Sequence, residues 1–559
     1  MKRLGIFIFY DKDGIVDDYV IYLLDKMREC WDDLVIISNG YLEATQSDRL
    51  RAFTDLLIMR ENWGLDAGAI RDFFLNQSVV KLSDYDELFW FNDTCYGPFF
   101  SMKSIFDAMS EREDVHFWGL IDQINSDVMR ENEFKYAKWI QTFFVAVKSK
   151  MFLADCFLDF WKNLAFEDDY LSVVTHYEMP FTEYFENHGF QYDVFCDYKK
   201  WLSHNKHGVN YSVHFPYELL TGFHFPLLKR KAFSLTLNKL LVQNDGNDMA
   251  LCLEYIRDHT DYPLDYIYKN LKRKYSQTEL EHCLGFKFIV DARDNGENDN
   301  YRIFAYIDSD YEASCAIAHF KLAGIDPGRV SFMVTGDKMM ALIQEALPSY
   351  EVVRAEKMTF LDFFSFVSAQ LKTEDYACLI YNKKSGSELP NVDGVRYRNT
   401  YWNLVQNAHY INNVMDVFKR NPWIGKLGAA KHTLSAEKTG KVDSEERAKI
   451  NKLCDDFGKY KYCDDYRFEN FDRCELSMWI KADLLQAISG KLVTLPKVDS
   501  QTFELALYYI IQNYDCFSGV VIHDLLAKRE LTNTQFFHQL STPLSVKMLE
   551  EERVKKKFV

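Results

Sequence analysis

The first hundred residues alternate short apolar runs with segments of helical spacing. The runs Ile6–Tyr10 and Leu34–Ile37 are continuous and rich in β-branched and aromatic residues. Uninterrupted runs of this kind are typical of strands that are buried on both faces of a parallel sheet. Residues 19–27, between the two runs, carry apolar side chains at helical spacing. The pattern predicts an α/β domain with a mainly parallel sheet.

Polar clusters stand where the predicted strands end. Asp11–Asp13 follow the first run, Ser38–Gly40 follow the second, and Asn92–Thr94 follow a third at Leu88–Phe91. Ligands of open α/β sheets bind outside the carboxyl ends of the strands. We therefore expect the functional site at this edge of the sheet.

The second half of the chain repeats features of the first half in the same order. An Asp-x-Asp triplet follows an apolar run at Asp308, as it does at Asp11. Glu504 lies nine residues before an asparagine, as Glu178 does. This internal repeat predicts two related Rossmann-like domains. Two unrelated α/β units are the alternative.

We predict three parts of the chain. Residues 1–235 form the first domain, residues 236–295 a helical connector, and residues 296–559 the second domain. The second domain has no carboxylate in its Tyr381–Ser385 segment, at the position that Asn92–Thr94 occupy in the first. We therefore interpret it as a degenerate copy that binds acceptor glycan or a partner, and a second, metal-independent transferase is the alternative.

Composition narrows the class of protein. Of the 559 residues 48% are hydrophobic and 27% are charged, which is typical of a folded chain. The net charge of −17 disfavours a broad nucleic-acid surface. The 12 cysteines include no C-x-x-C pair, so we expect neither a disulfide framework nor a zinc site, and a cytoplasmic location. No apolar run reaches transmembrane length, so we expect a soluble or peripheral protein.

A glycine-containing loop precedes the helix predicted at Asp66–Leu75. Gly64 follows the polar residues Arg60 and Asn62, so backbone can approach a nucleotide there, and a helix N-terminus favours phosphate. The alternative is an ordinary turn that needs glycine, which leaves the polar residues unexplained.

The Asn92-Asp93-Thr94 triplet ends a very apolar strand. One carboxylate beside an amide suits a divalent ion, either Mg²⁺ or Mn²⁺, that also binds diphosphate oxygens and water. An aspartate that caps a turn is the alternative for Asp93.

Four segments carry a family resemblance. The run from Tyr85 to Pro98, then His116–Leu120, Ile140–Phe144 and Phe160-Trp161, resembles the rhamnan synthesis protein F family of bacterial glycosyltransferases. The resemblance is strong over residues 1 to about 235. It implies two GT-A-like domains, a dTDP-L-rhamnose donor, and a lipid-linked cell-wall rhamnose polysaccharide as acceptor at the cytoplasmic face of the membrane.

The resemblance also implies roles for single residues. Glu178 lies eleven positions before Gly189, as the general base of inverting relatives does. A glutamate that stabilises a helix N-terminus is the alternative. Asp93 would bind the metal, and Lys229 would contact the diphosphate. The nucleotide-sugar residues would be Tyr10, Asp11, Asn39, Arg60, Asn62, Gly64, Asp66, Asn92 and Lys229. The acceptor or sugar residues would be Trp118, Gly119 and Gln141.

Other functions stay open at this point. Asp11 and Asp13 also fit the opening motif of haloacid-dehalogenase-type phosphatases, and a non-catalytic carbohydrate-binding scaffold is a third class. For the transferase we expect a nucleotide-diphosphate sugar and a lipid-linked glycan as partners, and no nucleic acid. Basic clusters at 229–231, 272–274 and 553–559 predict peripheral attachment to the membrane surface.

Overall fold

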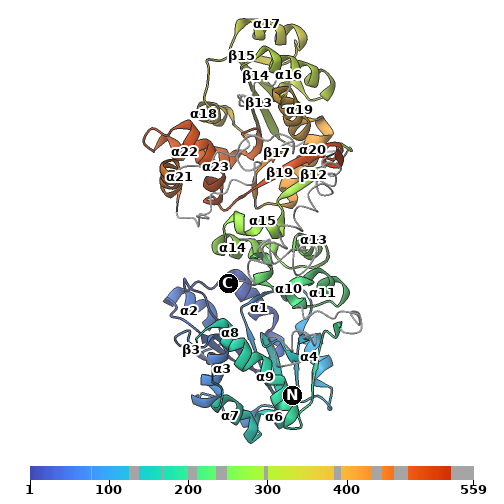
Figure 1. The fold of residues 1–559 in the computed structure, drawn as a ribbon, viewed down its shortest axis with the longest axis vertical. Helices are drawn as coiled ribbons and strands as arrows, with labels where there is room; N and C mark the ends of the chain where they lie inside the picture. The colour runs from blue at the N-terminus through green and yellow to red at the C-terminus, as the bar shows by residue number, and fades with distance from the viewer. Residues whose placement is uncertain are drawn as a thin grey trace, which may run out of the picture. The chain divides into compact units, whose positions relative to one another are not determined.

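The computed structural model describes most of the chain as two compact units, Met1–Gly285 and Phe286–Val559 (Figure 1). We describe each unit by itself. The predicted boundaries at residues 235 and 295 stay a prediction. The described residues are 1–76, 79–124, 138–165, 168–198, 210–234, 249–294, 300–382, 392–430, 444–458 and 476–529.

Unit 1 contains a seven-stranded sheet in the order β10-β6-β9-β4-β1-β2-β3. Every neighbouring pair is parallel except those that β9 forms with β4 and β6. This arrangement confirms the predicted α/β class with a mainly parallel sheet. The strands are β1 (Arg3–Phe9), β2 (Asp33–Ser38), β3 (Leu57–Met59), β4 (Glu87–Asn92), β6 (Phe117–Gly119), β9 (Phe144–Lys148) and β10 (Tyr192–Val194).

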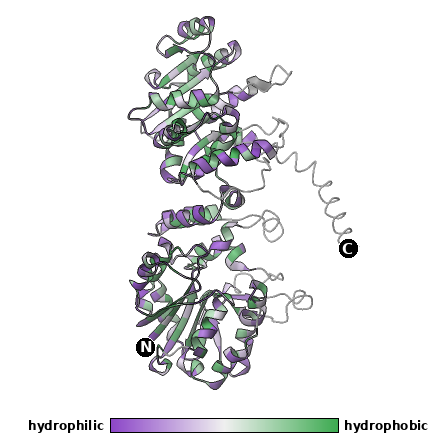
Figure 2. Ribbon diagram, turned by 90° about the vertical axis from the view of Figure 1, so that its left-hand side faces the viewer, coloured by the Kyte–Doolittle hydropathy of each residue, from purple (hydrophilic) through white to green (hydrophobic). Residues whose placement is uncertain are grey.

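Helices connect and cover the strands of unit 1, and the strands are largely hydrophobic (Figure 2). Aromatic rings fill much of the core. The ring centroid of Phe74 lies 4.9 Å from that of Phe157 and 5.3 Å from that of Trp161. The helices are α1 (Asp18–Lys26), α2 (Ala44–Arg51), α3 (Leu65–Asn76), α4 (Met102–Ser110), α6 (Ser149–Phe152), α7 (Asp155–Lys162), α8 (Tyr170–Val173), α9 (Met179–Asn187), α10 (Tyr211–His214), α11 (Pro216–Gly222), α13 (Met249–His259), α14 (Leu264–Lys274) and α15 (Gln277–Leu284).

Two short antiparallel ribbons complete unit 1. In one of them β5 (Cys95–Tyr96) pairs with β11 (Leu228–Lys229), which brings Lys229 opposite Cys95. Gly97 allows the close approach of the two chains, because a Cβ there would lie 2.5 Å from the carbonyl oxygen of Pro226 and its φ is +124°. The other ribbon joins β7 (Asp122–Ile124) to β8 (Lys138–Ile140).

Unit 2 contains an eight-stranded sheet in the order β12-β19-β17-β18-β16-β13-β14-β15. Only β18 runs antiparallel to its neighbours, β16 and β17. From β15 to β19 this order follows that of unit 1 from β3 to β10, strand by strand. The strands are β12 (Lys287–Val290), β13 (Tyr301–Ile307), β14 (Val330–Val334), β15 (Glu351–Arg354), β16 (Tyr376–Tyr381), β17 (Ile424–Ala429), β18 (Met478–Lys481) and β19 (Phe517–His523).

The shared strand order supports the predicted repeat, which itself stays a prediction. Residues 383–385, on which the expectation of a degenerate copy partly depends, lie outside the described residues. The helices of unit 2 are α16 (Asp310–Ala323), α17 (Asp337–Ala346), α18 (Phe360–Gln370), α19 (Val392–Val405), α20 (Ala408–Arg420), α21 (Ser444–Phe457), α22 (Ala482–Val493) and α23 (Ser500–Gln512).

Candidate functional site

A cavity of about 340 Å³ lies in unit 1 at the carboxyl edge of the sheet. Tyr10 follows β1, Asn39 follows β2, and Asn92 ends β4, so three neighbouring strands contribute to it. The cavity also brings together the predicted residues Asn62, Asp66, Asp93, Gln141, Glu178 and Lys229. Asp11, Arg60, Gly64, Trp118 and Gly119 are not among its lining residues.

The loop before α3 presents Asn62 to the cavity. Arg60 does not line the cavity but holds this loop in place, because its guanidinium donates to Asn39 Oδ1 at 2.8 Å and to the Trp63 carbonyl at 2.9 Å. The Gly64 amide is held by Asp168 Oδ1 at 2.7 Å. The side-chain oxygen of Asn62 is buried and has no hydrogen-bond partner among the described residues. That oxygen is ready to accept a hydrogen bond from a ligand.

Asp66 and Asn92 form one hydrogen-bonded pair on the cavity wall. Asn92 donates from Nδ2 to Asp66 Oδ2 at 3.0 Å, and the Ala67 amide donates to Asp66 Oδ1 at 2.9 Å. Burial raises the pKa of the Asp66 carboxyl, and the negative charge of Glu178 raises it further. Two carboxylates therefore share this wall.

Glu178 lies in a π-helical turn, Val174–Glu178, directly before α9. Its carboxylate accepts hydrogen bonds from Trp139 Nε1 at 3.2 Å, from the Thr142 amide at 3.2 Å and from the Thr142 hydroxyl at 3.0 Å. It stands directly before the first residue of α9 and makes no side-chain capping bond to it, so the alternative that its charge stabilises the helix N-terminus stays open. Turns of this kind often occur at functional sites.

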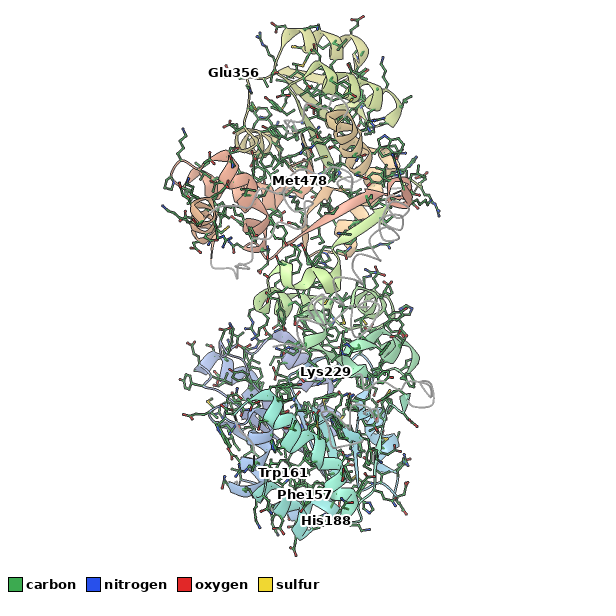
Figure 3. The ribbon with its side chains drawn as sticks, viewed as in Figure 1. Phe157, Trp161, His188, Lys229, Glu356 and Met478 are labelled. Atoms are coloured by element: carbon green, nitrogen blue, oxygen red, sulfur yellow. The ribbon has the colours of Figure 1, made fainter. Side chains whose placement is uncertain are left out.

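Lys229 brings a positive charge to the same cavity (Figure 3). Its ammonium lies 3.6 Å from the ring centroid of Phe143 and 3.3 Å from the Thr94 hydroxyl. Burial lowers the pKa of Lys229, and no ion pair joins it to a carboxylate in the part of the chain that the structure describes. A partly dehydrated ammonium in this setting favours an anionic ligand.

Asp93 is already paired with a cation. Arg230 donates to Asp93 Oδ2 at 2.7 Å and to the Asp93 carbonyl at 2.7 Å, and the buried Tyr19 hydroxyl donates to the same carboxylate oxygen at 3.2 Å. Among the described residues no group of three or more acidic, histidine or cysteine side chains is placed to hold a metal ion. These residues do not fit a divalent cation at Asp93, because the guanidinium already neutralises its carboxylate.

The remaining predicted residues lie elsewhere in unit 1. Burial acts to raise the pKa of Asp11, but hydrogen bonds from Arg273 and Lys274 of α14 outweigh it and hold that pKa well below its usual range. Trp118 is fully buried and donates to Glu87 Oε1 at 3.1 Å. A Cβ at Gly119 would lie 2.4 Å from the Ile140 side chain, so both Trp118 and Gly119 contribute to packing.

The sequence also left residues of the cavity unassigned. Thr142 lies within the Ile140–Phe144 segment that carries the family resemblance. Arg230 is next to Lys229, which the sequence analysis assigned to the diphosphate. Nothing in the sequence pattern points to three further polar lining residues, Tyr170, Asn210 and Tyr275.

The fold and the cavity define an α/β protein with a polar cavity, lined by both carboxylates and cations, at the carboxyl edge of its first sheet. Residues 34–492 match the model of the family described as Rhamnan synthesis protein F, and the chain belongs to that glycosyltransferase-like family. A curated relative, "Uncharacterized protein y4gN" of Sinorhizobium fredii (strain NBRC 101917 / NGR234), is 25% identical over 191 residues. That match covers 34% of this chain and 46% of the relative, so it spans less than half of the relative's length.

Solved structures show only weak similarity. A 4-diphosphocytidyl-2C-methyl-D-erythritol synthase of Anaerococcus prevotii DSM 20548 is 11% identical, with a TM-score of 0.24, over 40% of this chain and 86% of that chain. Core-mannan synthase A of Aspergillus fumigatus, in a Mn/GDP form, is 7% identical, with a TM-score of 0.19, over 28% of this chain and 63% of that chain. Scores this low support no argument about function.

Proposed function

We propose that unit 1 is an inverting glycosyltransferase that transfers a sugar, L-rhamnose, from a nucleotide diphosphate donor to a growing lipid-linked cell-wall polysaccharide. The observation that carries the proposal is the placement of the Glu178 carboxylate and the Lys229 ammonium in one cavity. Family membership supports the sugar class. The donor nucleotide, dTDP, comes from the family resemblance alone.

The donor would bind with its diphosphate near Lys229 and its base near Asn62. Lys229 supplies charge for the phosphate oxygens, and the unpartnered Asn62 oxygen accepts a hydrogen bond from a base N–H. The pair of Asp93 with Arg230 leaves Lys229 as the cation that receives the leaving group. Its positive charge stabilises the negative charge that develops on the diphosphate.

Glu178 would act as the general base. As the bond between the anomeric carbon and the diphosphate oxygen breaks, the acceptor hydroxyl oxygen attacks the opposite face of that carbon, and Glu178 takes the hydroxyl proton. Trp139 and Thr142 fix the carboxylate while this happens. Attack from the face opposite the leaving group inverts the anomeric configuration.

The phosphatase alternative finds no support in the position of Asp11. Both of its carboxylate oxygens accept hydrogen bonds from Arg273, at 3.2 Å and 2.6 Å, so the oxygen that would attack a phosphate is occupied.

Two of the three basic clusters that the sequence suggested for membrane attachment have other contacts in the structure. Lys229–Lys231 line the cavity and Arg273 pairs with Asp11, whereas residues 553–559 lie outside the described residues.

Peripheral attachment through the remaining tail stays part of the proposal. Among the described residues, no helix has the length and apolarity needed to span a bilayer. A lipid-linked acceptor would require the enzyme to reach a membrane surface, which basic residues near an anionic leaflet favour.

Isothermal titration of the full chain with nucleoside diphosphates tests the donor site. We expect binding of dTDP that Lys229→Gln weakens about tenfold or more, as the loss of a charge-assisted contact implies. Glu183→Gln is the matched control, because Glu183 is exposed on α9 and does not line the cavity. Absence of any nucleotide binding would favour the scaffold alternative.

A further inference from the structure

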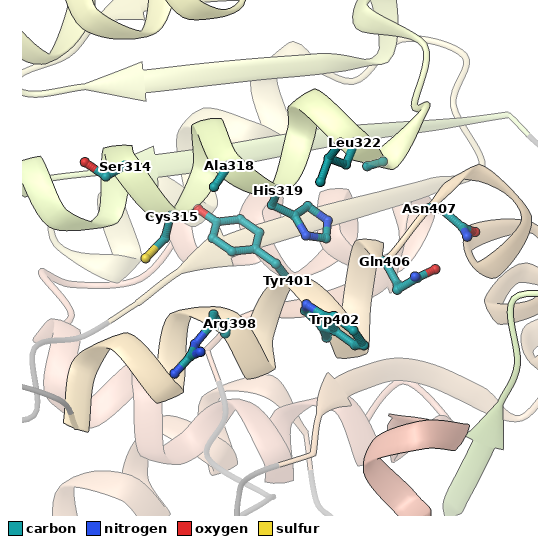
Figure 4. Close-up of a pocket in the computed structure, with 11 residues that line it drawn as sticks. Ser314, Cys315, Ala318, His319, Leu322, Arg398, Tyr401, Trp402, Gln406 and Asn407 are labelled. Atoms are coloured by element: carbon teal, nitrogen blue, oxygen red, sulfur yellow. The ribbon is translucent and has the colours of Figure 1, made fainter.

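Unit 2 contains a separate cavity of about 460 Å³ between α16 and α19. Ser314, Ala318, His319 and Leu322 face it from α16, and Tyr401 and Trp402 from α19 (Figure 4). The cavity in unit 1 lies at the carboxyl ends of the strands, whereas this cavity lies between two helices. The two cavities therefore do not correspond.

Two polar groups of the cavity lack partners. The Tyr401 hydroxyl and the Gln406 side-chain oxygen are buried, and neither has a hydrogen-bond partner among the described residues. Tyr401 as a whole is 1% exposed. Buried polar atoms are normally satisfied, so each unpaired one calls for a partner that the described chain does not supply.

A third group has a defined hydrogen-bond partner. His319 Nε2 lies 2.8 Å from the carbonyl oxygen of Val405, which can only accept, so Nε2 carries a proton and donates. Burial lowers the pKa of His319, which favours the neutral ring. Nδ1 is then an acceptor. Tyr401 stacks on this ring at a centroid distance of 5.3 Å, which fixes both rings in the wall.

The rest of the lining is mostly apolar or aromatic, with one cation and the polar residues Ser314 and Asn407. Trp402 is 37% exposed and Leu322 is 88% exposed, so both present apolar surface to solvent at this cavity. Arg398 places a positive charge at the cavity, and none of its described lining residues is a carboxylate. The lining therefore combines a flat aromatic surface with hydrogen-bond donors and acceptors and suits a neutral or anionic ligand.

We propose that this cavity binds a saccharide chain, the polysaccharide that the protein extends. Sugar rings have apolar faces that pack on aromatic rings such as Trp402, and hydroxyls that both donate and accept hydrogen bonds. A ligand of this chemistry satisfies Tyr401 and Gln406 together. An apolar helix would cover the groove but leave these two groups unpaired, at a free-energy cost.

The identity of the saccharide rests on the proposed function, since only the family name points to rhamnan. The lining residues of the cavity support only the class of ligand, a saccharide. Unit 2 would then hold the acceptor chain while unit 1 acts on it. This role does not require unit 2 to bind a nucleotide.

Titration of the full chain with rhamnan oligosaccharides of defined length tests the proposal. We expect saturable binding by calorimetry that Trp402→Ala weakens at least tenfold and that Trp402→Phe, which keeps a ring, weakens less than threefold. Tyr401→Phe removes the hydroxyl only and should weaken binding several-fold. Tyr311→Ala is the matched control, because Tyr311 is exposed on α16 and does not line the cavity.

Three outcomes would overturn the proposal. The first is an intact chain that binds no oligosaccharide. The second is unchanged binding by a Trp402→Ala variant that melts like the parent protein. The third is a dimer in sedimentation equilibrium that Trp402→Ala disperses without any saccharide binding, which would assign the surface to a second copy.

Donor hydrolysis in the same variants separates this proposal from the proposed function. Trp402→Ala should leave hydrolysis of the nucleotide sugar without acceptor unchanged, because the substitution is in unit 2. A parent chain that binds the oligosaccharide but neither hydrolyses nor transfers from any nucleotide sugar would refute the transferase and keep the saccharide site.

Discussion

The substitution Glu178→Gln separates the chemical role of this side chain from its structural one. The carboxylate accepts three hydrogen bonds, one on Oε1 from Trp139 and two on Oε2 from Thr142. An amide has only one acceptor oxygen. If that oxygen faces Thr142, both bonds there persist, and the amide NH₂ then faces the indole N–H of Trp139.

The expected magnitudes follow from this geometry. Loss of a general base lowers turnover roughly 10²- to 10⁴-fold, which corresponds to about 3–5 kcal/mol of activation free energy. The unpaired indole N–H lowers the free energy of unfolding by about 1–3 kcal/mol, because Trp139 is buried. Donor affinity should change little, since no hydrogen bond or ion pair joins Glu178 to Lys229 among the described residues.

The double variant Trp139→Phe/Glu178→Gln provides the control. Removing the indole N–H together with the charge should restore much of the lost stability, measured by urea unfolding, without restoring turnover. Transfer is measured as release of nucleoside diphosphate in the presence of acceptor. Turnover of Glu178→Gln within threefold of the parent protein would refute the reasoning, whatever the stability.

Four further expectations follow from particular contacts. Because burial lowers the pKa of free Lys229 and a bound diphosphate raises it, donor affinity should fall as the pH rises through that pKa, and Lys229→Gln should abolish this dependence in titrations. Because Arg230 pairs with Asp93, transfer should persist in EDTA to within about twofold; a rate that collapses and returns with Mg²⁺ or Mn²⁺ would contradict this. Gly97→Ala should destabilise the protein by about 1–3 kcal/mol in urea unfolding, whereas Gly222→Ala, where nothing lies within 4 Å of the new Cβ, should not. Deletion of residues 553–559 should reduce co-sedimentation with anionic vesicles, and equal pelleting of both forms would remove the tail from this role.

The architecture of unit 1 was accessible from the sequence because its signal is local. Continuous apolar runs such as Ile6–Tyr10 reveal buried parallel strands, and polar residues at the end of a run mark the edge where ligands bind. Asn39 and Asn92 were found in this way, and the structure brings them to one cavity.

The remaining features depend on contacts that no local pattern encodes. Arg230 meets Asp93 across 137 residues of sequence, and Arg273 meets Asp11 across 262. The sequence shows each charge but not its partner, so Asp93 was predicted as a metal ligand and Arg273 as part of a membrane-facing cluster. Trp118 shows the same limit, since its ring is buried against Phe106 of α4 and Phe144 of β9, which the local pattern around it does not reveal.

The most direct test of the account is transfer itself. The full chain is incubated with a panel of nucleotide sugars and a rhamnan oligosaccharide primer, and the products are analysed by NMR for the sugar added and its anomeric configuration. The account predicts extension of the primer from dTDP-L-rhamnose with inverted configuration, and its loss in Glu178→Gln but not in Glu183→Gln. Extension with retained configuration, or no transfer from any nucleotide sugar by a folded chain that binds dTDP, would contradict it.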